Sequence, residues 1–116
     1  MEAGMEQARM NIRQLLESRV RQHPEKAFLI FEDQVTSYAG FDTTVNRVAR
    51  GFLRLGIRAG DRVCVMVSNC PEFLYAWFGL MKIGAILVPM NSAFRHTETQ
   101  YIMQHAAAAA IVVDAA

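Results

Sequence analysis

The sequence predicts an α/β fold, in which an N-terminal helix and a β-hairpin precede a small parallel sheet with flanking helices. Three observations support this prediction. Two short β-prone runs lie near the N-terminus, separated only by the polar residues 32–34. An apolar segment of helix length, 73–83, leads through a glycine into an apolar run of strand length, 85–88. A third apolar run, 111–113, follows another helical segment, and helices are the usual connections between parallel strands.

The N-terminal third of the chain predicts a surface helix followed by the hairpin. Apolar residues recur at helical spacing, with charged residues on the other side: Ile12, Leu15, Leu16 and Val20. The helix should end before His23-Pro24, because the residue that precedes a proline avoids helical geometry. The two strands of the hairpin are expected at 27–31 and 35–37. Residues 1–9 are expected to form a frayed lead-in.

A longer amphipathic helix is predicted to follow the hairpin. Ser37 can cap its N-terminus, so that Tyr38 is the first helical residue, and Gly56 can end it. Its apolar stripe consists of Phe41, Val45, Val48, Ala49, Phe52 and Leu53. A capping box would need glutamate or glutamine three residues after the cap, but that position is Gly40. The helix start should therefore be about 1 kcal/mol less stable than one with glutamate at the position of Gly40.

The next segment predicts a strand–helix–strand unit. A strand is expected at 63–67, and Pro71 suits the first helical position, where its missing N–H costs nothing. Apolar residues cover nearly the whole circumference of the helix at 73–83, so we expect it to be buried. The strand at 85–88 is continuously apolar, as in parallel strands covered on both faces. Pairing should stop at Pro89, which cannot donate a hydrogen bond to a sheet.

The same apolar region could be interpreted as a membrane span, because residues 73–90 are long and apolar enough. Lys82, near its middle, would cost roughly 2.5–3.5 kcal/mol on insertion. Gly84 and Pro89 lie where a change from helix to strand would fall, so a buried helix and strand is the preferred interpretation. We expect Lys82 to be structural, with its ammonium at the helix C-terminus, so that arginine or methionine there should leave the fold largely intact.

The C-terminal part predicts one more helix and one more strand. Thr97 and Gln100 can form a capping box for a short helix that reaches His105. The alanines at 106–110 are interpreted as the helix end and a turn, which lead into a third parallel strand at 111–113.

Composition limits the classes of protein to consider. A net charge of +1, with scattered arginines, gives no reason to expect nucleic acid or an anionic membrane as a partner. Cys64 and Cys70 suit neither a disulfide framework nor a zinc site, so we expect two reduced structural thiols in a cytoplasmic protein. The N-terminus lacks the apolar core of a signal peptide. A hydrophobic fraction of 53% hints at apolar surface that the chain does not cover alone.

The residues themselves predict no catalytic or metal site. The glycines fit neither a Walker nor a Rossmann pattern, and Ser68 stands in no nucleophile-elbow frame. Metal-ligand spacing is absent around the three histidines, His23, His96 and His105. The loop after the second parallel strand, with Arg95 and His96, is a more interesting location. Ligands of open α/β sheets gather beyond the carboxyl ends of the strands, where this loop begins.

A family resemblance is carried by Asn69-Cys-Pro-Glu-Phe and by Trp77-Phe-Gly-Leu-Met-Lys-Ile-Gly-Ala-Ile-Leu-Val-Pro-Met-Asn. These residues resemble the N-terminal part of the adenylate-forming (AMP-binding) acyl-CoA ligases, and are most similar to the crotonobetaine/carnitine-type CoA ligases. The turn Gly56-Ile-Arg-Ala-Gly-Asp also matches the family pattern. The chain departs from it at Ser37-Tyr-Ala-Gly-Phe, where the family usually has Thr-Tyr-x-Glu-Leu.

The resemblance implies an ATP-dependent enzyme that activates a carboxylic acid as acyl-AMP and passes it to coenzyme A. The intact enzyme would use ATP, Mg²⁺ and coenzyme A. The family's phosphate-binding loop and catalytic lysine lie downstream of the matched region, so residues 1–116 are expected to be a partial N-terminal domain. The chain alone should bind none of these cofactors and be inactive. Arg95 matches the end of an Asn-x-Ala-Leu-Arg run in the carnitine-type ligases, and could either contact a phosphate or be a solvated loop arginine.

Two other functions fit the sequence. The chain could be a short, non-catalytic module that packs against a separate ligase subunit. It could also belong to an adenylating enzyme of the peptide-synthetase or luciferase type, because the same elements occur there. In each case the expected partner is the remainder of a ligase, or a second copy through exposed apolar surface.

Overall fold

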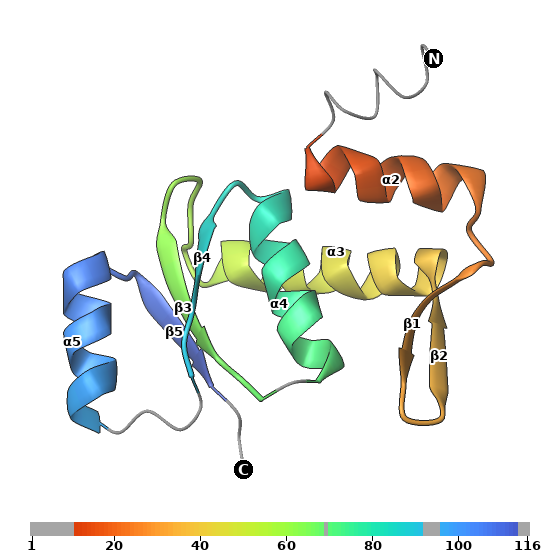
Figure 1. The fold of residues 1–116 in the computed structure, drawn as a ribbon. Coiled ribbons are helices and arrows are strands. Elements are labelled where there is room, and N and C mark those ends of the chain that lie inside the picture. Colours follow the sequence, from red (N-terminus) through yellow and green to blue (C-terminus); the bar gives the residue numbers. More distant parts are fainter. Residues whose placement is uncertain (1–10, 69, 92–95, 114–116) are drawn as a thin grey trace.

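The computed structural model describes residues 11–68, 70–91 and 96–113, and it confirms the predicted α/β fold class (Figure 1). The elements in chain order are α2 (Ile12–Gln22), β1 (Ala27–Phe31), β2 (Gln34–Ser37), α3 (Tyr38–Arg54), β3 (Arg62–Met66), α4 (Pro71–Lys82), β4 (Ile86–Pro89), α5 (His96–Ala106) and β5 (Ala110–Val113). The lead-in predicted for residues 1–9 lies outside the described residues.

The strands form two separate sheets. β1 and β2 make an antiparallel hairpin, and β3, β4 and β5 make a parallel sheet in the order β4-β3-β5. Helix α4 joins β3 to β4, and α5 joins β4 to β5 across the central strand. Helices α3 and α4 lie on one side of the parallel sheet and α5 on the other, while the hairpin projects beside the N-terminal end of α3 (Figure 1).

The helix starts follow local sequence signals. The side chain of Ser37 accepts a hydrogen bond from the backbone N–H of Gly40 at 3.1 Å, which confirms the predicted cap of α3. Helix α2 begins with a capping box between Asn11 and Gln14, whose side chains each accept from the other residue's backbone N–H. Pro71 begins α4 as predicted, and this proline needs no N–H partner there.

The main core lies between the parallel sheet and helices α3 and α4. Val63 and Val65 of β3 are fully buried against this helix pair, which contributes Phe52 and Leu80. The two helices approach closely at Gly79, where a Cβ atom would lie 2.9 Å from Cγ1 of Val48. Glycine at this position therefore allows α4 to lie directly against α3.

A second core joins α2 and the hairpin to the same pair of helices. Leu16 of α2 packs there with Phe41, Val45 and Phe78. Phe28 of β1 extends this cluster: its ring centroid lies 4.6 Å from that of Phe41 and 6.4 Å from that of Phe78. Aromatic packing thus fixes the hairpin and α2 to the body of the molecule.

The structure corrects two predicted details of burial. Only β3 has a run of fully buried residues, whereas β4 and β5 are half-buried or exposed along their lengths. Helix α4 buries only four residues, Ala76, Phe78, Gly79 and Leu80, and its other apolar side chains are half-buried. Helix α5 buries no residue. Within the described residues, three consecutive residues are fully buried only in β3, the strand that lies between β4 and β5.

Two predicted boundaries are wrong. Pro89 belongs to β4, opposite Val65, and the N–H of Met90 still donates to the carbonyl of Val65 at 2.9 Å. Because β4 has only one neighbouring strand among the described residues, the missing N–H of Pro89 faces away from the ladder. Helix α5 begins at His96, so Thr97 lies inside the helix and is not its cap.

The turn conformations agree with the sequence. Gly84, after α4, has a φ of +78°, a left-handed conformation that glycine adopts without strain. The alanine run forms the end of α5, a turn with a positive φ of 52° at Ala107, and the start of β5 at Ala110. None of the described helices has both the length and the apolar character needed to cross a membrane.

Candidate functional site

The carboxyl ends of β3, β4 and β5 lie at one edge of the parallel sheet, where the sequence suggested a ligand site. Met66 ends β3, and its sulfur lies 3.9 Å from Oγ1 of Thr99 in α5. The hypothesis for this edge concerned Arg95, which lies outside the described residues, so its phosphate contact stays a prediction. His96 is the first residue of α5 and is exposed.

Met66, Val67 and Met90 lie at the strand ends of this edge, and the polar residues Ser68 and Asn91 directly follow them in the chain. In the portion of the chain that the structure describes, no three His, Cys, Asp or Glu residues gather to hold a metal ion.

Both cysteines are free thiols, and burial raises the pKa of Cys64 in β3. A raised pKa lowers the thiolate fraction, so Cys64 is suited to packing and not to nucleophilic chemistry.

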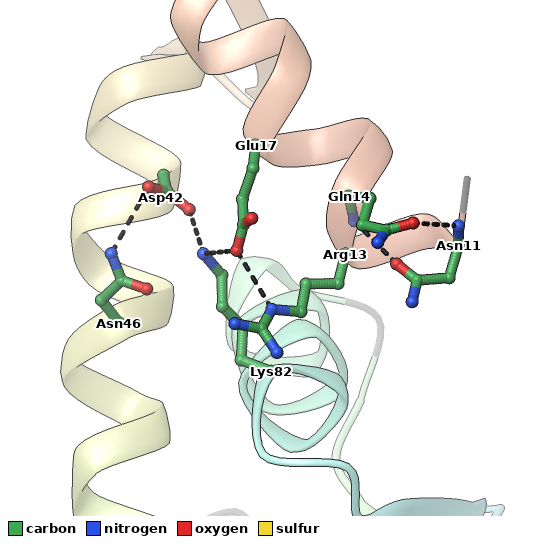
Figure 2. A network of polar contacts seen from close by, with 7 residues as sticks. All are labelled: Asn11, Arg13, Gln14, Glu17, Asp42, Asn46 and Lys82. Atoms are coloured by element: carbon green, nitrogen blue, oxygen red, sulfur yellow. Dashed lines mark hydrogen bonds and ion pairs between the residues drawn. The ribbon is translucent and has the colours of Figure 1, made fainter. Parts of the chain in front are cut away.

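A cluster of polar side chains among the described residues joins three helices (Figure 2). The ammonium of Lys82, at the end of α4, lies 2.7 Å from Oδ1 of Asp42 in α3 and 3.4 Å from Oε1 of Glu17 in α2. The Nε atom of Arg13 lies 3.1 Å from the same Glu17 oxygen. The amide of Asn46 donates to the other oxygen of Asp42 at 3.4 Å. We call these five residues the three-helix cluster.

The cluster corrects the predicted environment of Lys82. Its side chain is only 10% exposed, and two carboxylates from other helices bind the ammonium that was expected at the C-terminus of α4. A buried ammonium needs such partners, because an unpaired charge in an apolar interface is costly. The cluster therefore joins α2, α3 and α4, and we now expect methionine at this position to be less well tolerated than the sequence suggested.

Glu17 makes the stability of the cluster dependent on pH. Burial raises the pKa of Glu17, but the hydrogen bond from Arg13 and the charge of Lys82 outweigh it and hold the pKa below its ordinary value of 4.5. A carboxyl group whose pKa is lower in the folded state binds more protons when unfolded. Its stabilising effect is therefore complete above pH 4.5 and is lost as the pH falls through the lowered folded value.

We expect Glu17→Gln to flatten the fall in the free energy of unfolding that the chain shows below about pH 4.5. Urea unfolding at a series of pH values, followed by circular dichroism, measures this slope. Glu25→Gln is the control, because Glu25 is exposed and lies outside the cluster. Equal slopes in the unmodified chain and the Glu17→Gln variant would show that Glu17 does not carry this acid sensitivity.

Comparison with known proteins assigns the chain to a family. The family model described as AMP-binding enzyme matches residues 16–116. Crotonobetaine/carnitine–CoA ligase of Salmonella typhi is 41% identical over 110 residues, which cover 90% of this chain and 21% of that protein. The same enzyme of Salmonella enteritidis PT4 is 41% identical over 107 residues. The chain spans about a fifth of the length of these curated relatives.

Solved structures show the same fold. The N-terminal subdomain of NpsA from Klebsiella oxytoca, in complex with anthranilyl-AMSN, superposes with a TM-score of 0.85 at 23% identity, covering 90% of this chain and 27% of that chain. O-succinylbenzoate coenzyme A synthetase from Bacillus subtilis, in complex with AMP, superposes with a TM-score of 0.82 at 24% identity, covering 86% and 26%. Because the family model matches most of its length, this chain belongs to the AMP-binding enzyme family and corresponds to the family's N-terminal region.

Proposed function

We propose that this chain supplies the N-terminal part of an ATP-dependent acid–CoA ligase. The intact enzyme would activate a carboxylic acid as acyl-AMP and transfer the acyl group to coenzyme A, with Mg²⁺ as the ion that accompanies ATP. The observation that carries the proposal is the 41% identity to crotonobetaine/carnitine–CoA ligase over 110 residues. A related synthetase from Bacillus subtilis binds ATP and a magnesium ion in its crystals, which supports the cofactor assignment.

The chain would contribute a scaffold for the ligands of that enzyme. Its parallel strands bring three carboxyl ends to one edge of the sheet, and ligands of α/β sheets gather beyond such an edge. Arg95 follows β4 in the sequence, and its guanidinium would bind a phosphate group of ATP or coenzyme A there. The acid would be a short polar or betaine-like carboxylate, by similarity to the relatives' substrate. The two free thiols fit a cytoplasmic enzyme.

The groups that perform the chemistry would come from another part of the enzyme. The sequence contains no glycine-rich phosphate-binding loop, and acyl-adenylate formation depends on groups that position the phosphates and stabilise their charge. The isolated chain should therefore be inactive, and its partner would be the remainder of the ligase.

A hybrid enzyme tests this proposal. The 110 matched residues of Salmonella typhi crotonobetaine/carnitine–CoA ligase are replaced by the corresponding residues of this chain. We expect the hybrid to form a coenzyme A thioester from crotonobetaine or carnitine with ATP and Mg²⁺. The isolated chain should catalyse no pyrophosphate exchange with any acid of a panel. A folded hybrid that is inactive with every acid would contradict the proposal, and so would ATP- and acid-dependent turnover by the isolated chain.

A further inference from the structure

The outer face of the hairpin exposes an apolar pair. Ile30 of β1 and Val35 of β2 lie opposite each other in the antiparallel register, and they are 69% and 64% exposed. Phe31, the next residue of β1, points to the opposite face of the hairpin. Cross-strand neighbours of this kind form one continuous surface, because their Cβ atoms lie about 5 Å apart. We call Ile30 and Val35 the hairpin patch.

The inner face of the same hairpin is also apolar. Phe28 packs against the aromatic rings of Tyr38 and Phe41. Leu29 and Phe31 line a hollow together with residues at the start of α4, Cys70, Pro71, Phe73 and Leu74. An antiparallel sheet that faces water on one side normally has polar residues there, and a two-stranded sheet alone is marginally stable. A hairpin with apolar residues on both faces is therefore suited to burial on both faces.

Charges border the hairpin patch at its tip. The turn between the strands carries Glu32 and Asp33, both exposed. Protein interfaces combine an apolar centre with a polar rim, and charges of opposite sign across the rim set the orientation of the partners. The surface that fits this face is an apolar patch flanked by lysine or arginine side chains.

We propose that the hairpin patch docks against the remainder of the ligase polypeptide, on an apolar surface flanked by basic side chains. The proposal rests on the proposed function, because the occupant is the part of the enzyme that this chain does not span. The chain matches 21% of its relative's length, so about four-fifths of that enzyme is available to cover the hairpin. The hairpin projects beside the N-terminal end of α3, where a neighbouring part of the protein can reach its outer face (Figure 1).

Thiol labelling measures this contact without using enzyme activity. A Val35→Cys substitution, in a Cys70→Ser background, is made in both the isolated chain and the hybrid enzyme. We expect a small maleimide to label the isolated chain rapidly and the hybrid at least about tenfold more slowly, since labelling of a covered residue requires local opening. A Leu55→Cys variant is the control, because Leu55 is 78% exposed at the end of α3, and it should be labelled equally in both proteins.

Charge substitution gives a second measurement. Ile30→Lys and Val35→Lys should leave the melting temperature of the isolated chain almost unchanged, because both positions are exposed there. The same changes should lower the melting temperature of the hybrid by at least about 3 °C, because a lysine would be buried in the interface. Leu55→Lys should have no such effect in the hybrid.

The outcomes separate this proposal from the proposed function. Protection of the Val35→Cys thiol in a folded hybrid that lacks activity would leave the docking proposal standing and contradict the proposed function. Equal labelling of the Val35→Cys variant in both proteins, or equal protection of the Leu55→Cys variant, would overturn the docking proposal even if the hybrid is active. Protection in the isolated chain, at a concentration where it associates with itself, would instead assign the patch to a second copy and would also overturn it.

Discussion

Replacing Lys82 with methionine should lower the free energy of unfolding by about 2 kcal/mol. The substitution keeps most of the apolar stem, which packs between the helices, but it removes the ammonium that two carboxylates share. Asp42, with a side chain only 18% exposed, then keeps its negative charge without an opposite charge beside it. Removal of one partner from a fully buried pair costs about 3–5 kcal/mol, and the partial exposure of Glu17 and Asp42 reduces that figure.

A double-mutant cycle distinguishes the lost charge from lost packing. Asp42→Asn removes the charge that Lys82→Met leaves unpaired, so the double variant should be more stable than the sum of the single effects predicts. Lys82→Arg should be better tolerated than methionine, because it keeps the positive charge. Urea unfolding of the four proteins gives the coupling energy. Additive effects would mean that the Lys82–Asp42 ion pair contributes little, and that the packed stem of Lys82 provides most of its effect, as the sequence had suggested.

The local elements of this fold could be predicted because their signals lie within a few residues. Ser37 precedes a helical stripe, and Pro71 begins an apolar helix, so both helix starts could be placed from the sequence. The capping box of α2 was missed, although Asn11 followed by Gln14 is its sequence signature. The predicted cap at Thr97 was wrong, because α5 begins one residue earlier, at His96.

The three-helix cluster could not be predicted in the same way. Lys82 lies 40 residues from Asp42 and 65 from Glu17 in the sequence, so no local pattern joins them. The only signal was the presence of a lysine in an apolar helix, which indicates that a partner must exist but does not identify it. Residues that meet through tertiary packing become visible only when α2 and α3 are placed against α4.

Strand burial depended on the order of strands in the sheet, which the sequence does not contain. The apolar runs at β3, β4 and β5 are similar, yet only β3 is buried through most of its length. The difference arises because β3 lies between the other two strands, each of which has one neighbour among the described residues. Apolar composition therefore predicts that a strand can be buried, and the topology decides whether this chain buries it.

The isolated chain should expose enough apolar surface to bind the dye ANS and to sediment as more than a monomer at high concentration. β4 and β5 are half-buried or exposed, with Ile86 and Val113 47% and 53% exposed. α5, on the other side of the sheet, buries no residue. Burial of apolar area is worth about 25 cal/mol per Å², so a few hundred Å² left uncovered forfeits several kcal/mol. That loss is comparable with the whole stability of a small domain.

The hybrid enzyme is the matched control for this last prediction, because it contains the same residues with the remainder of a ligase beside them. If uncovered sheet surface is the cause, the hybrid should bind little ANS and sediment as a single species, and the isolated chain should associate more at higher concentration. Val113→Lys places a charge on β5, which lies at one side of the described sheet, and should reduce that association without changing the fold. A dye-negative, monodisperse isolated chain that unfolds cooperatively at high temperature would mean that these residues close their own core. The function as a short, non-catalytic module that binds a separate ligase subunit would then explain the chain better than the proposed one.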